Sequence, residues 1–441
     1  MAQVCKSLGL KDKLVLVGLF ITLFLALVAS FILPLFVTVI VVNFFLLFVL
    51  VLFLTLYLSD KDQGKAKYLK NYPSLSILIA SYNSKRTIVE CINSVKNLKY
   101  PRKLEIVVVN DGSTDGSELM LKKMKGITLI NLKKNSGKAV ALNTGLKFIK
   151  NDYVACIDSD TYPESDTFLK TMGYFTDAKV GAVTCLILPD KKQSLIQRIQ
   201  FIEYAMGFGL WTTLLSSIDS MTMIPGPMTI FKREFFVKAG GYEDGNLTED
   251  MEIGLRLQKY GYKIKTCFEA VAYTDIPDTL GKLFKQRDRW YRGRIFNLMG
   301  YKELFFSKKN FDLGFFSLPY LFALELVSVI MLFKVGFLFI ENLSRFVIVQ
   351  SGLVALTSSV VIVLKEIILP SSVIFLITSY CLVLLYMYIS LRLIHYKPTG
   401  LDYLAILINL LFYPLFVTVV YFQSFIKEML GVRSSWVRVS I

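Results

Sequence analysis

Two carboxylates placed one residue apart directly follow an apolar segment of this chain. Asp158 and Asp160 come after Tyr153–Ile157, which has the composition of a buried strand. Carboxylates at a strand end can hold Mg²⁺ or Mn²⁺, because these ions prefer oxygen ligands and share their sites with substrate phosphates. The same spacing arises elsewhere in the chain by chance, so the position at a strand end is what makes this pair informative.

A second acidic group, Thr248-Glu249-Asp250, precedes a segment at 251–259 that is predicted to be helical. A carboxylate in this position can act as a general base when an acceptor hydroxyl comes within reach. The same residues also suit a helix start, with Thr248 as the N-cap and acids in the first turn. The two interpretations are compatible.

Two basic segments are candidates for binding phosphate. Gln286-Arg287-Asp288-Arg289-Trp290 lies in the stretch 282–309, which holds nine Lys and Arg and two acids. This stretch is either a basic interfacial helix with an aromatic anchor or a site where Arg289 contacts phosphate and Trp290 stacks on a sugar. Asn135-Ser136-Gly137-Lys138 is either a turn with a solvated lysine or a source of charge that neutralises a diphosphate.

These candidates need a scaffold, and the segment after Pro73 predicts one. Strands are expected at 74–80, 104–110, 128–132 and 153–157, and helices at 85–97 and 138–150. This alternation predicts a doubly wound, mainly parallel α/β sheet, in which ligands bind beyond the carboxyl ends of the strands. Three polar clusters fall at such ends: Ser81-Tyr82-Asn83, Asn110-Asp111 and Asp158-Ser159-Asp160. No glycine-rich phosphate motif follows the first strand, which argues against a dinucleotide or P-loop site.

The composition excludes an ordinary soluble protein. The chain has 441 residues, of which 54% are apolar and 19% charged, with a mean hydropathy of +0.53. Residues 59–312 hold 39 of the 50 basic and 28 of the 34 acidic residues, so a charged domain lies between apolar flanks. The net charge of +16 suits a cytoplasmic face on anionic lipid, and we expect no nucleic-acid partner.

The cysteine and histidine content narrows the chemistry. A single histidine, His395, argues against a histidine-ligated zinc site and against a Ser-His-Asp triad. The six cysteines are scattered without a C-x-x-C motif, so we expect buried thiols in a reducing compartment.

The N-terminal flank predicts a membrane hairpin. The segments 14–33 and 35–58 are each long enough to cross a hydrocarbon core of about 30 Å. Three lysines precede the first segment and predict a cytoplasmic N-terminus: Lys6, Lys11 and Lys13. A cleaved signal peptide is the alternative, but the apolar run is too long for one and a second span follows at once.

The C-terminal flank contains four further apolar runs, at about 315–340, 346–364, 370–391 and 403–425. Two plus four spans place both chain ends in the cytoplasm. Arg392, His395 and Lys397 would then lie outside, so one run could instead be interfacial or re-entrant, giving five spans. Glu325 lies within the first of these runs and indicates a polar path or a paired contact, with a hydrogen-bonded structural glutamate as the alternative.

Taken together, the motifs resemble family 2 glycosyltransferases, specifically the membrane-embedded processive synthases of hyaluronan, chitin, cellulose and poly-N-acetylglucosamine. The arrangement of two plus four helices looks most like that of hyaluronan synthases. The resemblance covers residues 73–295, and six ordered motifs carry it: Ser81-Tyr82-Asn83, 109–115, 135–143, Asp158-Ser159-Asp160, Thr248-Glu249-Asp250 and 286–290.

The resemblance implies a GT-A fold between membrane helices and an inverting transfer from a UDP-sugar to a growing polysaccharide, with Mg²⁺ or Mn²⁺ as cofactor. It implies that Asp250, beside Glu249, is the catalytic base and that Asp160 binds the metal. The substrate-binding residues would be Tyr82, Asn83, Asp111 at the uracil, Lys138 at the diphosphate, Asp158 at the nucleotide, and Gln286, Arg287, Arg289 and Trp290 at the diphosphate and acceptor end.

The same resemblance implies a multi-pass protein of the cell membrane with its catalytic domain in the cytoplasm. The expected divisions are a hairpin at 1–58, a GT-A domain at 59–275, a basic interfacial region at 276–312 and a membrane bundle at 313–441. An accessory subunit and a homo-oligomer both stay open. The alternative activity is transfer of a single sugar to a lipid-linked acceptor.

Two positions depart from the family pattern. Ser84 stands where many relatives carry Glu, and Pro225-Gly226-Pro227-Met228 replaces the usual small-residue acceptor loop. The identity of the sugar therefore stays open.

Overall fold

The computed structural model describes residues 64–350 and 371–432 continuously, together with scattered residues before residue 60 and the pair 435–436. The expected N-terminal spans at 14–33 and 35–58 lie largely outside the described residues, as does most of the expected span at 346–364.

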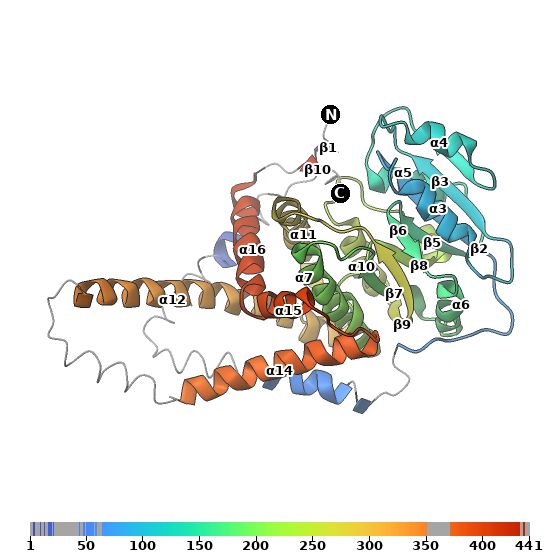
Figure 1. The fold of residues 1–441 in the computed structure, drawn as a ribbon. Coiled ribbons are helices and arrows are strands. Elements are labelled where there is room, and N and C mark those ends of the chain that lie inside the picture. The colour runs from blue at the N-terminus through green and yellow to red at the C-terminus, as the bar shows by residue number, and fades with distance from the viewer. Residues whose placement is uncertain are drawn as a thin grey trace.

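The centre of the molecule is an eight-stranded sheet in the order β4-β3-β2-β5-β8-β7-β9-β6 (Figure 1). Its strands are β2 Leu75–Ser81, β3 Glu105–Asn110, β4 Thr128–Asn131, β5 Tyr153–Asp158, β6 Thr161–Pro163, β7 Val180–Pro189, β8 Met228–Lys232 and β9 Lys263–Thr274. The four strands expected from the sequence are all present. A separate two-stranded ribbon joins β1 Gln3–Val4 to β10 Ser435–Trp436.

The sheet is mainly parallel as predicted, with four parallel pairings that include β7 with β9, but three antiparallel pairings make it mixed. Strands β4, β3, β2 and β5 pair in parallel as expected. Strand β8, however, runs antiparallel to both β5 and β7, and β6 runs antiparallel to β9. Next to the first residue of β8, the Asp158 N–H donates to the Pro227 carbonyl at 2.9 Å. Strand β8 thus begins at the carboxyl end of β5 and runs back along it.

Helices cover both faces of the parallel half of the sheet. They include α3 Ile88–Lys96, α4 Ser117–Lys123, α5 Lys138–Leu146 and α6 Thr167–Thr171. Successive side chains of a strand point to opposite faces. Accordingly, Ile77 and Ile79 of β2 pack in one buried cluster with α3, whereas Leu78 packs in another with α5. Two layers of core thus fix the strand ends that carry the polar clusters.

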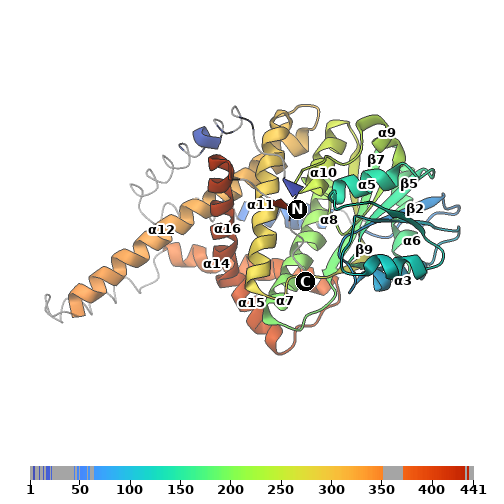
Figure 2. The same ribbon diagram turned by 90° about the horizontal axis from the view of Figure 1, so that it is seen from above.

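The second half of the chain adds helices beside the antiparallel strands (Figure 2). They are α7 Leu195–Tyr204, the π-helix η2 Ala205–Trp211, α8 Thr212–Ser217, α9 Arg233–Ala239, α10 Glu249–Lys259 and α11 Leu280–Gly300. A further group follows: η4 Asp312–Ser317, α12 Leu318–Gln350, α14 Ser371–Leu393, α15 Leu401–Leu411 and α16 Tyr413–Leu430. Helices α12 and α14 project away from the sheet in both views.

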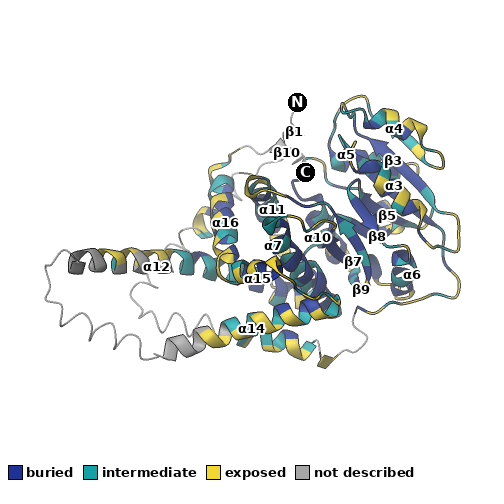
Figure 3. Ribbon diagram, in the orientation of Figure 1, coloured by how far each residue is buried: buried dark blue, intermediate teal, exposed yellow. Residues whose placement is uncertain are grey.

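The described helices include one that is long and apolar enough to cross a membrane, Asp312–Lys334. Helices α15 and α16 pass the same test only as a pair, and they are bent by 48° at the break between them. This geometry fits a broken span or a re-entrant segment, which was the alternative left open by the charges near His395. From Ile377 onward, helix α14 exposes several apolar side chains, Leu385 among them (Figure 3).

Buried charges in the helical half are paired. Glu325 of α12 forms an ion pair with Arg294 of α11, which is a paired contact. Four of the cysteines are buried free thiols, as expected, whereas Cys381 is exposed.

Candidate active site

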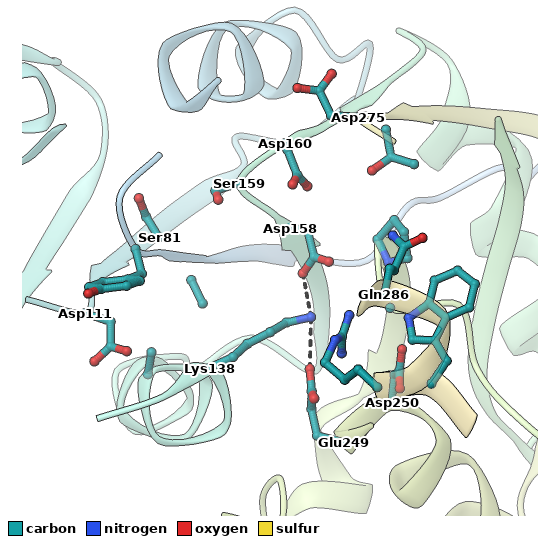
Figure 4. Close-up of a pocket in the computed structure, with 18 of the residues that line it drawn as sticks. Ser81, Asp111, Lys138, Asp158, Ser159, Asp160, Glu249, Asp250, Asp275 and Gln286 are labelled. Carbon is teal, nitrogen blue, oxygen red and sulfur yellow. Dashed lines mark ion pairs between the residues drawn. The ribbon is translucent and has the colours of Figure 1, made fainter. Parts of the chain in front are cut away.

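A cavity of about 180 Å³ opens where β2 and β5 end and where α5 and α10 begin (Figure 4). Most of the residues expected from the sequence line it: Tyr82, Asp111, Lys138, Asp158, Asp160, Glu249, Asp250, Gln286, Arg289 and Trp290. Asn83 and Arg287 do not line this cavity. Segments more than 200 residues apart in the sequence therefore meet in one place.

Asp111 is buried at the end of β3, and backbone N–H groups hold its carboxylate. The N–H of Ser136 donates to one oxygen at 2.7 Å and the N–H of Gly137 donates to the other at 2.8 Å. Burial raises the pKa of Asp111, and these two donors partly offset the rise. Asp111 therefore anchors the turn that leads into α5 and sets the position of Lys138.

Lys138, the first residue of α5, is the cation at the centre of the cavity. Its Nζ atom lies 2.7 Å from Asp158 Oδ1 and 2.9 Å from Glu249 Oε1 (Figure 4). Burial lowers the pKa of Lys138, but the two carboxylates outweigh it and raise the pKa above its ordinary value. The lysine is therefore charged and links the end of β5 to the start of α10.

Glu249 and Asp250 begin α10, and their pKa values are shifted in opposite directions. Burial raises the pKa of Glu249, but Lys138 lowers it further than that, so Glu249 stays ionised. Burial and the neighbouring charge of Glu249 raise the pKa of Asp250 to about 6. A carboxylate with a raised pKa accepts a proton more readily than an ordinary one, as a general base near neutral pH requires.

Asn83 has a structural role in this structure and is not a lining residue. Its backbone N–H donates to Ser113 Oγ at 3.0 Å, and its Oδ1 accepts the N–H of Thr114 at 2.8 Å. Its φ of 47° lies in the left-handed region that Asn tolerates better than most residues. Asn83 thus ties the loop after β2 to the loop after β3 and keeps Tyr82 at the cavity wall.

The donors around Asp160 suit a hard divalent cation. Among the described residues, no group of three or more His, Cys, Asp or Glu could hold a metal ion. Asp158 and Asp160 nevertheless both line the cavity with oxygen ligands. Mg²⁺ is usually bound by one or two carboxylates together with substrate phosphates and water. The residues present fit a cation that arrives with a diphosphate.

The Gln286–Trp290 motif occupies the middle of α11, and its residues face different ways. Arg289 Nη1 donates to the Leu247 carbonyl at 3.0 Å, next to the acids of α10. Arg287 is buried and bonds Glu203 of α7 and Tyr413 of α16. The Arg287 guanidinium also lies 4.2 Å from the centre of the Trp290 ring. Arg287 therefore holds Trp290 and the surrounding helices in place, and it lines a neighbouring cavity and not the first one.

A second cavity of about 260 Å³ adjoins the first and was not expected from the sequence. The two cavities share a wall formed by Tyr204, Gly226, Pro227, Asp250 and Trp290. The second cavity extends to η2 and α12, where Phe208, Trp211 and Leu321 line it. Aromatic rings and an apolar end distinguish it from the acidic first cavity.

Sequence reasoning missed two other lining residues. Asp275 lies at the end of β9, and its N–H donates to the Asp160 carbonyl at 3.2 Å. Tyr204 lies at the end of α7 and lines both cavities. Asp275 carried a weak signal, since it follows a strand as Asp158 does, whereas nothing in the sequence marks Tyr204.

Comparison with known proteins agrees with this geometry. The model of the family described as "Glycosyl transferase family 2" matches residues 76–239. Poly-beta-1,6-N-acetyl-D-glucosamine synthase of Staphylococcus aureus (strain COL) is 36% identical over 223 residues, which is 50% of this chain and 54% of that protein. The synthase of the same name from Staphylococcus epidermidis (strain ATCC 35984) is 35% identical over the same length. The chain spans about half the length of these curated relatives.

A solved structure shares the fold. The mannosyltransferase PcManGT of Pyrobaculum calidifontis, solved in complex with GDP-Man and Mn²⁺, superimposes with a TM-score of 0.52 at 18% sequence identity. The match covers 85% of this chain and 98% of that one. This likeness supports the GT-A type of fold for the mixed sheet described above.

Proposed function

We propose that the protein is a membrane-bound glycosyltransferase that polymerises a UDP-sugar, since the family 2 glycosyltransferase model matches residues 76–239. The curated relatives are named as poly-beta-1,6-N-acetyl-D-glucosamine synthases, and we propose an N-acetylhexosamine as the first sugar to test. The growing polysaccharide is the proposed acceptor, and its passage across the membrane is part of the proposal.

One observation carries the proposal: the two cavities meet at Asp250 and Trp290. The first is acidic and suits a nucleotide diphosphate with its cation. The second is lined by aromatic rings, which can stack on the apolar faces of sugars, and it extends to α12, the helix with a membrane-spanning composition. A proposed base at the shared wall lies where donor and acceptor sugars must meet.

Asp160 would hold Mg²⁺ or Mn²⁺ in the first cavity, with Asp158 beside it at the nucleotide. The cation would stabilise the negative charge that develops on the leaving diphosphate. Lys138 lies between Asp158 and Glu249 and places a second positive charge on the same side. The leaving group is UDP, whose negative charge is stabilised in this way, so no general acid is needed to protonate it.

Asp250 would remove the proton from the acceptor hydroxyl as its oxygen bonds to C1 of the donor sugar. The bond from C1 to the diphosphate breaks in the same displacement, and the attack from the opposite face inverts the anomeric carbon. Glu249, kept ionised by Lys138, maintains the raised pKa of Asp250. The positive charge of Arg289 acts on both acids in the direction that lowers their pKa.

The membrane organisation is also a proposal. We propose a multi-pass protein of the cell membrane, with the hairpin at 1–58, the cytoplasmic domain at 59–275, the interfacial region at 276–312 and the bundle at 313–441. The apolar span Asp312–Lys334 and the exposed apolar side chains of α14 support it. Lipid would contact these helices.

The second candidate function is transfer of one sugar to a lipid-linked acceptor, which the closeness of the site to α12 also accommodates.

Purified protein incubated with a panel of UDP-sugars and Mn²⁺ tests the proposal, with UDP release as the readout. We expect one UDP-sugar to release UDP steadily and the Asp250→Asn protein to release at most about one-hundredth as much. No UDP release from any sugar would contradict the proposal.

A further inference from the structure

The turn before the two acids of α10 is bonded to the side of α11. The Asn297 amide group donates to the carbonyl of Thr248 at 3.0 Å and lies 3.0 Å from the Thr248 hydroxyl. The amide of Asn246 in turn donates to Asn297 Oδ1 at 2.6 Å. Asn246 also accepts the Thr248 N–H at 3.0 Å and so closes the turn on itself. Two side-chain amides thus link the turn to one position of α11.

These contacts are buried. Asn297 is 1% exposed, Thr248 6% and Asn246 7%. Water does not reach such groups freely, so a partner that is removed leaves a buried donor or acceptor without a hydrogen bond. Gly293 allows the close approach, because a Cβ atom there would lie 2.3 Å from Thr248 Oγ1. Helix α11 is therefore shaped to receive this turn.

The start of α10 depends on these bonds more than a helix start usually does. Thr248 occupies the N-cap position, but its side chain makes no capping bond to the helix. Its carbonyl accepts the Glu252 N–H at 3.1 Å, as the first helical bond, and the Asn297 amide as well. Thr248 thus holds the N-cap position that the sequence predicted, but a tertiary contact and not a side-chain cap bond fixes the turn. The position of Asp250, two residues on, is set from α11.

Helix α11 is itself held to the helical bundle. Asp288 forms an ion pair with Lys427 of α16, and Arg292 forms one with Glu428 of the same helix. The helix that positions the turn is therefore fixed to the part of the molecule that adjoins the membrane span.

We infer that Asn297, together with Asn246, is a positioning residue that holds the Asp250 carboxylate in its reactive place against α11. The inference rests on the proposed function for its catalytic consequence. It adds a connection between the acid at the reaction centre and the helix that carries the Gln286–Trp290 motif. Neither asparagine touches the donor cavity, so their effect reaches the reaction only through the turn.

The experiment compares Asn297→Ala, Asn246→Ala and the double variant with wild type. Ile295→Ala is the matched control, because Ile295 is equally buried on α11 but packs towards Leu16 and Phe425. We expect the asparagine variants to lose at least about tenfold in kcat per folded protein, since small misplacements of a catalytic group are costly. UDP affinity and the KM for the donor should stay within about twofold of wild type. The double variant should lose no more than the worse single variant, because both remove the same link.

Two readouts separate positioning from a general loss of structure. With a looser turn, Asp250 gains water and its pKa falls, so the acidic limb of the kcat/KM profile moves to lower pH. Hydrogen exchange of the amides at 247–252 should rise in Asn297→Ala and stay at the wild-type level in Ile295→Ala. The exchange measurement reads the link even if the wild-type protein transfers no sugar, so failure of the proposed function is seen separately. If the wild type transfers sugar, a kcat of Asn297→Ala equal to that of wild type would overturn the inference. Hydrogen exchange at 247–252 that is unchanged in Asn297→Ala would overturn it as well.

Discussion

Gly226 lies directly against the carboxylate of Asp250: a Cβ atom on Gly226 would lie 2.6 Å from Asp250 Oδ2. Gly226 lines both cavities at their shared wall. The absence of a side chain there leaves room for the acid and for whatever approaches it. In the sequence, this glycine was notable only as part of an unusual proline-flanked loop.

Gly226→Ala should therefore move the Asp250 carboxylate while the protein still folds, because the far end of a side chain can rotate away. We expect kcat to fall by roughly 10- to 100-fold, the scale of a displacement of about 1 Å at a reacting group. UDP binding should not change. Gly281→Ala is the control, since a Cβ atom there meets nothing within 4 Å. Equal activity of the two variants would mean that the contact has no catalytic consequence.

The raised pKa of Asp250 predicts the pH dependence of the reaction. A general base works only when it is deprotonated, so kcat/KM should be constant at high pH and fall as the pH drops below about 6. An ordinary aspartate would hold its activity to about pH 4. Glu249→Gln removes the nearby negative charge and should shift the acidic limb to lower pH. A limb that stays in place in Glu249→Gln would show that burial alone sets this pKa.

Asp160→Asn tests the proposed cation site. The amide keeps the shape of the side chain but loses the charge that attracts Mg²⁺ or Mn²⁺. We expect activity to be abolished at ordinary metal concentrations and the fold to survive. Excess EDTA should have the same effect on the wild-type protein. Full turnover in the presence of the chelator would contradict the metal assignment.

Trp290→Ala tests the acceptor side. Arg287 covers one part of the ring, and the ring also lines both cavities. An aromatic face on a sugar is worth about 1–3 kcal/mol by analogy with stacking on bases. The variant should make shorter chains while donor binding survives, and Trp290→Phe should restore part of the length. A helix that merely anchors at the membrane surface would instead give less folded protein with products of normal length.

The sequence predicted the parallel half of the sheet and the meeting of its strand ends because both follow from local periodicity. Asp111, Asp158 and Asp160 came together for that reason. The antiparallel return of β8 could not be predicted in this way, since its pairing with β5 joins residues more than 70 positions apart.

The placement of side chains was harder to foresee than that of strands. Asn83 and Arg287 were expected to bind substrate from their place in the motifs. In the structure Asn83 is hydrogen-bonded to a neighbouring loop and Arg287 to neighbouring helices. The bonds of Asn297 to the turn before α10 join residues 49 and 51 positions apart. Contacts of this kind have no periodic signature, so only the folded chain reveals them.

The size of the product tests the central proposal most directly. Purified protein is given one UDP-sugar and Mn²⁺. The products are separated by length at two times: when less than one sugar per enzyme molecule has been consumed, and when many sugars per enzyme molecule have been consumed. A processive synthase makes long chains while most enzyme molecules have not yet acted, and their length depends little on enzyme concentration. Products extended by one sugar, with no longer chains at any time, would contradict polymerisation and leave the single-transfer alternative.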